Sequence, residues 1–189
     1  MTESLRRAQS EALLDSLTGL KNRRGLERAV EDLLREPAGL VGSALLLADI
    51  DHFKVVNDTY GHVLGDKVIR AVAHVLRSTL KGRDVAARLG GEEFAVLLPQ
   101  TSLSGAAVVA EQIRGTVAQG RILRPDGTES IGQVTLSVGV ALARPGDTLE
   151  MLLERADTAM YTAKRAGRNR ISVADENNTG ASATAAFHS

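Results

Sequence analysis

Residues 88–94 read Arg-Leu-Gly-Gly-Glu-Glu-Phe and lie between an alternating segment and an apolar run that ends at Leu98. Two strands joined at a Gly-Gly turn form a hairpin, because glycine tolerates the positive φ values that a tight connection demands. The stretch therefore predicts a hairpin with Glu92 and Glu93 at or just past its tip. Neighbouring strand residues point to opposite faces, so only one of these carboxylates is expected to face a given partner. Taken alone, an acidic hairpin tip is more often an ordinary solvated surface feature.

The composition describes one globular domain. The chain has 189 residues, of which 43% are hydrophobic and 24% charged, enough for one buried core and short for two. Lys plus Arg and Asp plus Glu each number 23. The chain therefore lacks the excess positive charge that would indicate nucleic acid or a membrane surface as a partner. The absence of cysteine excludes disulfides and thiolate metal sites. The longest apolar stretch, near residues 44–50, is far below the roughly 20 residues of a membrane-spanning helix, and we expect a cytoplasmic domain.

Hydrophobic periodicity predicts helices that alternate with strands. Residues 43–50 form an unbroken apolar run, which predicts a central strand covered on both faces. Large and small residues alternate over 134–142, which predicts a strand with another element packed closely on its small-residue face. Residues 1–14 are expected to be a frayed helix or the end of a coiled-coil stalk, and 175–189 a disordered tail. Further helices are expected over 23–35, 52–60, 65–80, 103–117 and 149–166, and a short strand over 171–173.

This order of elements predicts an α/β domain over residues 15–174, with the hairpin at its centre. Asp49 and Asp51 end the buried strand, at the edge where open sheets place their ligand sites. Either carboxylate would also serve as a cap of the next helix. If the hairpin pairs beside this strand, Asp49 and one glutamate converge. Oxygen ligands without His or Cys suit Mg²⁺ or Mn²⁺, and Mg²⁺ favours substrates that carry phosphates.

Basic side chains close to these carboxylates are candidates for holding phosphates. Lys54 follows the acidic pair, and Lys164 and Arg168 are four residues apart, so we expect both on one face of the last helix. Cations at a helix C-terminus also simply complement its dipole. Backbone N–H groups after the buried strand are a second candidate for phosphate contacts. Asp66 suits the N1–H and N2–H₂ edge of guanine, and Asn57 offers a donor and an acceptor.

Several motifs in one order resemble the GGDEF family of diguanylate cyclases, and together they span roughly residues 15–173. They are residues 15–24 (DSLTGLKNRR), 49–58 (DIDHFKVVND), 61–66 (GHVLGD), 90–94 (GGEEF) and 157–169 (DTAMYTAKRAGRN). The resemblance implies a palm-like α+β sandwich, similar to class III nucleotidyl cyclases, with a mostly antiparallel central sheet flanked by helices. It also implies an output module of a bacterial signalling protein that joins two GTP into cyclic di-GMP and releases two pyrophosphates.

The resemblance also implies roles for single residues. The metal ligands fall on Asp49, the backbone carbonyl of Ile50 and Glu92, for two Mg²⁺ or Mn²⁺ in each active site. The catalytic residues are Glu92 as the favoured base, Lys54 as the group that stabilises the transition state, and Glu93. The substrate-binding residues are Phe53, Asn57, His62, Asp66, Gly90, Gly91, Lys164 and Arg168.

The reaction implies a symmetric partner. Each subunit holds one GTP, and the hydroxyl of one must reach the α-phosphate of the other, so we expect a twofold homodimer as the active unit. The sensor domain that would control it is expected upstream and absent from this chain. Two alternatives stay open: a catalytically silent module that binds GTP or responds to cyclic di-GMP, and a cyclase with a different product.

The chain departs from the family pattern at the inhibitory site where many relatives bind their own product. That site consists of Arg-x-x-Asp shortly before the glycine pair and a second arginine on the following helix. Here Lys81 and Asp84 occupy the first motif, and Gln112 occupies the helix position. Lysine lacks the planar fork that pairs two ways with phosphate, so we expect a degenerate site with weak or absent product inhibition. Arg83 and Arg114 lie nearby but out of register.

Overall fold

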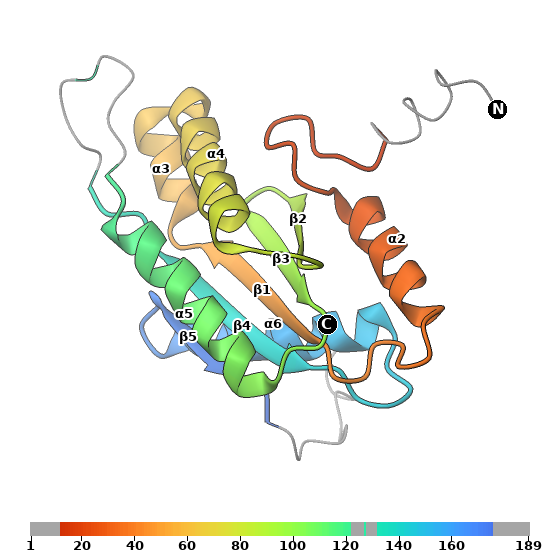
Figure 1. The fold of residues 1–189 in the computed structure, drawn as a ribbon. Helices are drawn as coiled ribbons and strands as arrows, with labels where there is room; N and C mark the ends of the chain where they lie inside the picture. The colour runs from red at the N-terminus through yellow and green to blue at the C-terminus, as the bar shows by residue number, and fades with distance from the viewer. Residues whose placement is uncertain (1–11, 122–126, 128–131, 176–189) are drawn as a thin grey trace, which may run out of the picture.

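A five-stranded sheet forms the centre of the computed structural model, which describes residues 12–121, 127 and 132–175 (Figure 1). The strand order is β2-β3-β1-β4-β5, and every pairing is antiparallel except that of β4 with β5. The expectation of a mostly antiparallel sheet flanked by helices is therefore confirmed. The strands are β1 (Ala44–Ile50), β2 (Val85–Gly90), β3 (Glu93–Leu98), β4 (Leu136–Leu142) and β5 (Arg170–Val173). The helices are α2 (Arg23–Leu34), α3 (Phe53–Tyr60), α4 (His62–Thr79), α5 (Leu103–Gln119) and α6 (Leu149–Arg165).

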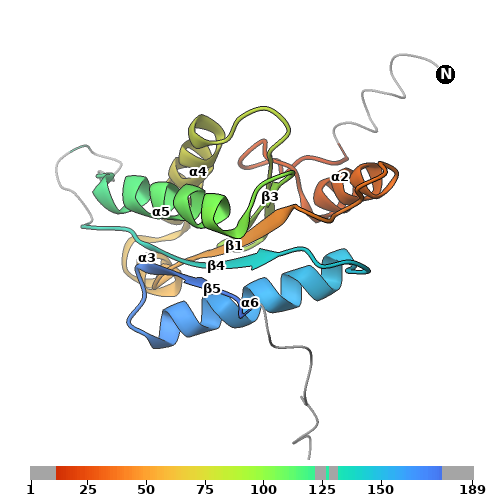
Figure 2. The same ribbon diagram turned by 60° about the horizontal axis from the view of Figure 1, so that its bottom comes forward.

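Strand β1 occupies the middle of the sheet, and each of its seven residues is buried. Alternate side chains of a strand point to opposite faces, so burial at every position requires a layer on each side. Figure 2 shows that α4 and α5 lie on one side of the sheet and α6 lies on the other. The prediction of a central strand covered on both faces is confirmed.

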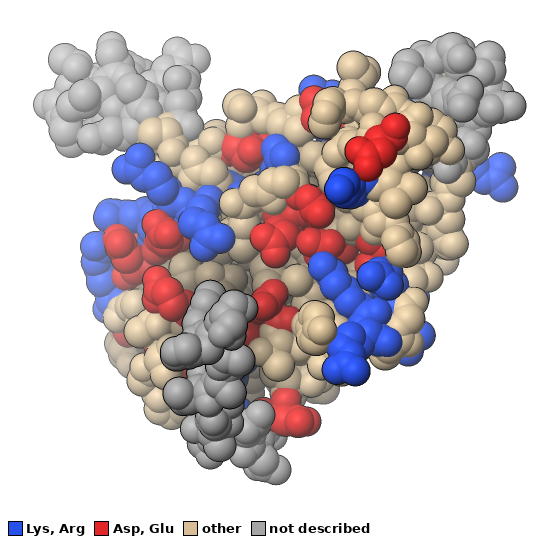
Figure 3. All heavy atoms as spheres, turned by 180° about the vertical axis from the view of Figure 1, so that it is seen from behind, with Lys and Arg blue, Asp and Glu red and all other residues tan. Residues whose placement is uncertain are grey.

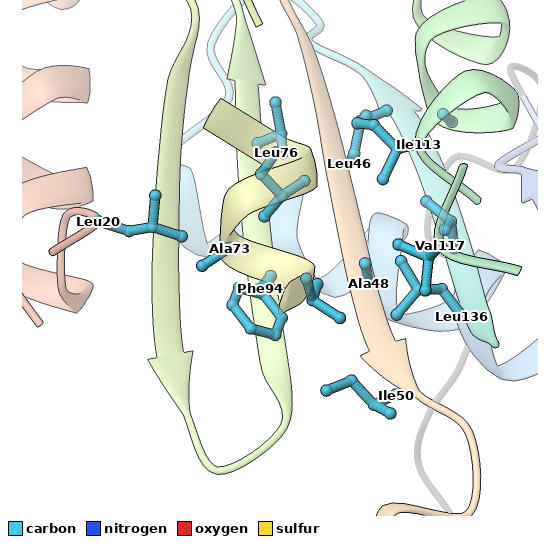
Figure 4. Close-up of a cluster of buried hydrophobic side chains, with 14 of the residues drawn as sticks. Leu20, Leu46, Ala48, Ile50, Ala73, Leu76, Phe94, Ile113, Val117 and Leu136 are labelled. Carbon is cyan, nitrogen blue, oxygen red and sulfur yellow. The ribbon is translucent and has the colours of Figure 1, made fainter. Parts of the chain in front are cut away.

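Each face of the sheet has its own hydrophobic cluster. The first cluster joins β1, β3 and β4 to α4 and α5, and it contains Leu46, Leu76, Phe94 and Ile113 (Figure 4). The second cluster joins the opposite faces of the same strands to α2 and α6. Among the described helices, none combines the length and the apolar character needed to cross a membrane.

The start of the described chain differs from the predicted N-terminal helix. Residues 12 and 13 form a turn, and Leu14 pairs with Lys21 in an isolated β-bridge. The side-chain amide of Asn22 donates to the carbonyl oxygens of Ala12 at 2.9 Å and Leu14 at 3.2 Å. These carbonyl groups are thereby used outside a helix, so the prediction is wrong for residues 12–14. The other residues of the predicted stalk, and the predicted tail after Asp175, lie outside the described residues.

Helix α4 begins three residues earlier than its apolar stripe indicated. Gly61 adopts φ 83° between α3 and α4, and its carbonyl oxygen accepts from the N–H of Gly65 at 3.2 Å. Gly65 is therefore inside the helix instead of at its start. A positive φ at Gly61 lets two helices meet there with no longer linker.

Helix α6 crosses β4 at a glycine. A Cβ atom on Gly139 would lie 1.9 Å from the carbonyl oxygen of Ala156 and 2.4 Å from the backbone nitrogen of Met160. Both atoms belong to the helix backbone, which cannot move aside as a flexible side chain would. The expected close packing on the small-residue face of this strand is confirmed, and it holds α6 against the sheet.

This contact predicts that Gly139→Ala destabilises the domain, because the added methyl group pushes α6 away from β4. We expect a loss of roughly 3 kcal/mol in the free energy of unfolding, measured from urea unfolding curves. Gly115→Ala is the matched control, because Gly115 lies in α5 and a Cβ there meets nothing within 4 Å. The control should gain up to about 1 kcal/mol from its helix propensity. Equal unfolding midpoints for Gly139→Ala and the wild type would contradict this packing.

Candidate active site

The carboxyl end of β1 brings Asp49 beside the hairpin. Asp49 is directly opposite Glu93 in the antiparallel pairing of β1 with β3, so the two side chains share one face of the sheet. One residue on, the backbone N–H of Ile50 donates to the carbonyl oxygen of Glu92 at 3.3 Å. The hairpin thus pairs beside the acidic strand end, as the predicted convergence of Asp49 with one glutamate requires.

The tip of the hairpin is shifted by one residue from the predicted Gly-Gly turn. Gly90 still belongs to β2 and pairs with Glu93, so Gly91 and Glu92 form the connection. The register shifts between Arg88 and Gly90, which accounts for the displacement. Gly91 has φ 50°, and a larger residue would be strained there. Glu92 lies at the tip and Glu93 is the first residue of β3, so the predicted position of this acidic pair is confirmed.

An arginine ties the hairpin tip to the start of the domain. The guanidinium of Arg88 donates to the carbonyl oxygen of Gly91 from Nε at 3.0 Å and from Nη2 at 2.8 Å. Its Nη1 also pairs with Asp15 at 3.2 Å. Burial raises the pKa of the Asp15 carboxyl, but hydrogen bonds from Thr18 and the charge of Arg88 outweigh it, and the net pKa is lowered. Sequence reasoning assigned no role to this pair, since the two residues are 73 positions apart and no local pattern joins them.

The electrostatics around Asp49 favour a cation. The net pKa of Asp49 is raised to about 6, mainly by burial, and the negative charges of Glu92 and Glu93 contribute to this rise. Lys164 opposes this rise, with Nζ 3.1 Å from Asp49 Oδ1. Within the described ranges, no three His, Cys, Asp or Glu side chains are grouped as a metal site by themselves. The predicted ligand set counts two carboxylates and a backbone carbonyl, and hard oxygen donors of this kind suit Mg²⁺ or Mn²⁺.

Asp51 has different surroundings, although it is only two residues from Asp49. One carboxylate oxygen accepts from the hydroxyl of Ser137 at 2.7 Å. The other accepts from the hydroxyl of Thr135 at 2.7 Å and from the backbone N–H of Asn169 at 3.0 Å. The alternative of a helix cap is wrong for Asp51, because the cap residue of α3 is His52 and no side chain bonds there.

The candidate guanine residues lie where α3 meets α4. Asn57 comes from α3, and its buried Oδ1 has no hydrogen-bond partner. A Cβ atom on Gly65 of α4 would lie 1.9 Å from that oxygen. His62 and Asp66 belong to the first turns of α4. Phe53 belongs to the hydrophobic core, and its Cζ would lie 3.2 Å from a Cβ atom on Gly65. The ring of Phe53 therefore packs against α4 at the point where α3 meets it.

The candidate phosphate residues do not share one helical face as predicted. Lys164 is in the last turn of α6, but the helix ends at Arg165 and Arg168 lies beyond it with φ 62°. Gly167, at φ 115°, turns the chain out of the helix. Lys54 is exposed in the first turn of α3. On the α6 side of the molecule, acidic groups gather near the middle with Lys and Arg groups beside them (Figure 3).

The degenerate inhibitory motif forms a local turn. A carboxylate oxygen of Asp84 accepts from the backbone N–H of Lys81 at 3.0 Å. The two displaced arginines have other partners: Arg83 pairs with Glu36, and Arg114 pairs with Glu111. Gln112 is exposed on α5. These ion pairs are consistent with the expectation that neither arginine replaces the missing one.

Comparison with known proteins places these motifs in one family. Residues 12–170 match the family described as "Diguanylate cyclase, GGDEF domain". The diguanylate cyclase VdcA of Vibrio cholerae is 43% identical over 171 residues, which are 90% of this chain and 50% of VdcA. The response regulator PleD of Caulobacter vibrioides is 45% identical over 163 residues, 85% of this chain and 36% of PleD.

A solved structure agrees with the fold. The GGDEF domain of DgcB from Caulobacter crescentus, in complex with c-di-GMP, matches with a TM-score of 0.82 and 41% identity. The match covers 87% of this chain and 94% of that one. The chain spans half or less of the length of the two curated relatives. It belongs to the GGDEF family of diguanylate cyclase domains.

Proposed function

We propose that this domain condenses two GTP into cyclic di-GMP and releases two pyrophosphates, as the output module of a signalling protein. The observation that carries the proposal is the position of buried Asp49 opposite Glu93 and beside Glu92. A cluster of carboxylates with so little compensating charge favours a divalent cation, and therefore a substrate that carries phosphates. The diguanylate cyclase relatives support this choice of reaction.

Asp49, the carbonyl oxygen of Ile50 and Glu92 would hold Mg²⁺ or Mn²⁺, with two ions in each site. When bound, these ions neutralise charge on the α-phosphate and lower the pKa of the attacking 3′-hydroxyl. Glu92 accepts the proton of that hydroxyl. The 3′-oxygen then forms a bond to the α-phosphorus, and the bond from this phosphorus to the pyrophosphate oxygen breaks. Lys54 stabilises the negative charge of the transition state, with Glu93 beside the reacting groups.

The remaining residues bind GTP. Lys164 and Arg168 hold the phosphates by charge, and backbone N–H groups at the start of α3, where no side chain caps the helix, add hydrogen bonds. Asn57 and Asp66 read the guanine edge, since the partnerless Oδ1 of Asn57 is an acceptor that a guanine N–H group would satisfy. His62 completes the pocket. Gly90 and Gly91 leave room for the nucleotide at the hairpin, because neither carries a side chain.

A second copy of the chain completes the reaction. Each copy presents one GTP, so the 3′-hydroxyl in one half-site must meet the α-phosphate in the other. A twofold homodimer brings both pairs together at once. The input that aligns the copies would come from a sensor domain upstream of residues 15–174.

The proposal predicts that the domain converts GTP to cyclic di-GMP and pyrophosphate in the presence of Mg²⁺, and that Glu92→Gln abolishes this conversion. We expect a rate at least about 100-fold lower, because the substitution removes both the base and a metal ligand. The product is measured by chromatography and mass spectrometry. Glu154→Gln, an exposed acidic position on α6, is the control and should keep the wild-type rate. A wild-type rate in Glu92→Gln, or a product other than cyclic di-GMP, would refute the proposal.

Guanine readout predicts a selective loss of affinity in Asn57→Ala and Asp66→Ala. Each substitution should lower the affinity for GTP by roughly 10-fold or more, because a buried polar group of the base is left without a hydrogen-bond partner. Gly65→Ala should have a similar effect, since its methyl group displaces Asn57 Oδ1. Binding of inorganic triphosphate, measured by calorimetry, should stay unchanged in all three variants. Equal losses for GTP and triphosphate would contradict guanine recognition by this corner.

The degenerate inhibitory motif predicts that added cyclic di-GMP scarcely slows the wild-type reaction. Lysine and glutamine at positions 81 and 112 supply neither of the two guanidinium forks that grip the product. A Lys81→Arg, Gln112→Arg double variant should become sensitive to micromolar product. The measurement is a progress curve for GTP with and without added cyclic di-GMP. Strong inhibition of the wild type would show that Lys81 or a shifted arginine is enough.

A further inference from the structure

The turn after α6 has an unusual backbone. Arg168 and Asn169 both have positive φ, 62° and 46°, and neither is glycine. Residues with a Cβ adopt this left-handed region only at a cost in free energy, and they keep it where surrounding contacts over-determine it. The N–H of Arg168 donates to the carbonyl oxygen of Ala163 at 3.1 Å, and Arg168 itself is exposed. Two further contacts hold Asn169.

The first such contact comes from β1. Asp51 is only 6% exposed, and its Oδ2 accepts from the backbone N–H of Asn169 at 3.0 Å. The hydroxyl groups of Thr135 and Ser137 bind the same carboxylate, each at 2.7 Å, so it cannot rotate without losing a hydrogen bond. The turn is thereby attached to the sheet two residues after Asp49. Arg168 directly precedes Asn169 in the chain, so this hydrogen bond also keeps Arg168 near the end of β1.

The second contact comes from α5. Nη1 of Arg114 donates to Oδ1 of Asn169 at 2.6 Å. The guanidinium is itself held in place, since its Nε donates to Glu111 at 2.9 Å and only 18% of its side chain is exposed. Arg114 is 55 residues from Asn169 in the chain. The proposed reaction gives no role to Arg114, Asn169 or Asp51.

We propose that Arg114 and Asp51 are positioning residues, which clamp Asn169 from two sides so that the left-handed turn presents Arg168 to a polyphosphate. The inference rests on the proposed function for the identity of that ligand as the triphosphate of GTP. Asp51 fixes the backbone of the turn, and Arg114 fixes the side chain of Asn169. Without the second contact the turn relaxes toward ordinary φ values, and the guanidinium of Arg168 leaves its place.

A double-mutant cycle tests the clamp. Binding of inorganic triphosphate is measured by calorimetry for Arg114→Met, Arg168→Ala and the double variant. Arg114→Met alone should lower the affinity for triphosphate by roughly 5- to 10-fold. An effect of this size is within the range of coupling found for residues that act through one another. In the Arg168→Ala background the same substitution should have no further effect. Arg28→Met is the matched control, because Arg28 is an exposed arginine on α2 that pairs with Glu31, and it should leave the triphosphate affinity unchanged.

A purely structural role would give a different result. In that case Arg114→Met would weaken triphosphate equally in both backgrounds, in step with a lower melting temperature, and the inference would be overturned. Unchanged affinity in Arg114→Met would overturn it as well. Asn169→Ala removes the same hydrogen bond from its other end. Asn169→Ala replaces Arg114→Met in the double-mutant cycle if Arg114→Met does not fold.

The wild-type cyclase assay separates this inference from the proposed function. If the wild type makes no cyclic di-GMP but the triphosphate cycle shows coupling, the clamp stands and the proposed reaction fails. If the wild type makes cyclic di-GMP and the cycle shows no coupling, the clamp fails and the reaction stands.

Discussion

The register of β1 between β3 and β4 is the constraint on which the site depends. A slip of one residue would carry Asp49 to the other face of the sheet, away from Glu93 and Lys164. Hydrophobic pattern alone does not determine this register, because β1 is apolar on both faces. Side-chain size contributes to the register, because Leu47 pairs with Gly139, and α6 packs so closely on Gly139 that no larger residue fits there. The hydrogen bonds that the Asp51 carboxylate accepts from Thr135 and Ser137 then hold the end of the strand. Packing and polar contacts therefore select the same register.

Local sequence pattern was sufficient for the elements that form this frame. An unbroken apolar run predicted β1, a glycine pair predicted the hairpin, and small residues facing one way predicted the close approach of a helix to β4. One error could have been avoided with the same information. The prediction that Arg168 shares a helical face with Lys164 is wrong, because Gly167 lies where glycine commonly ends a helix, and there the chain leaves α6. The spacing of four residues has meaning only inside a helix.

Contacts between distant residues were beyond such reasoning. Arg88 meets Asp15 across 73 residues, Asp51 meets Asn169 across 118, and Arg114 meets Asn169 across 55. Each contact joins residues of two different elements or loops that only the completed sheet brings together. Periodicity describes which face of an element is buried, and it contains no information on which polar side chains meet at the edges. These contacts hold the hairpin tip and the turn that carries Arg168, and no local pattern in the sequence indicates any of them.

The two aspartates at the end of β1 illustrate why structure adds to a motif. In the sequence they are equivalent, two carboxylates that follow one buried strand. In the fold, three hydrogen bonds satisfy Asp51 within the protein, so it acts as an anchor. Asp49 is buried beside two glutamates with Lys164 as its nearby cation, and Asn57 retains a buried oxygen without a partner. A folded chain leaves polar groups this poorly compensated where a ligand completes them. This difference in hydrogen bonding agrees with the roles proposed above, in which Asp49 and Asn57 bind ligands and Asp51 supports the fold.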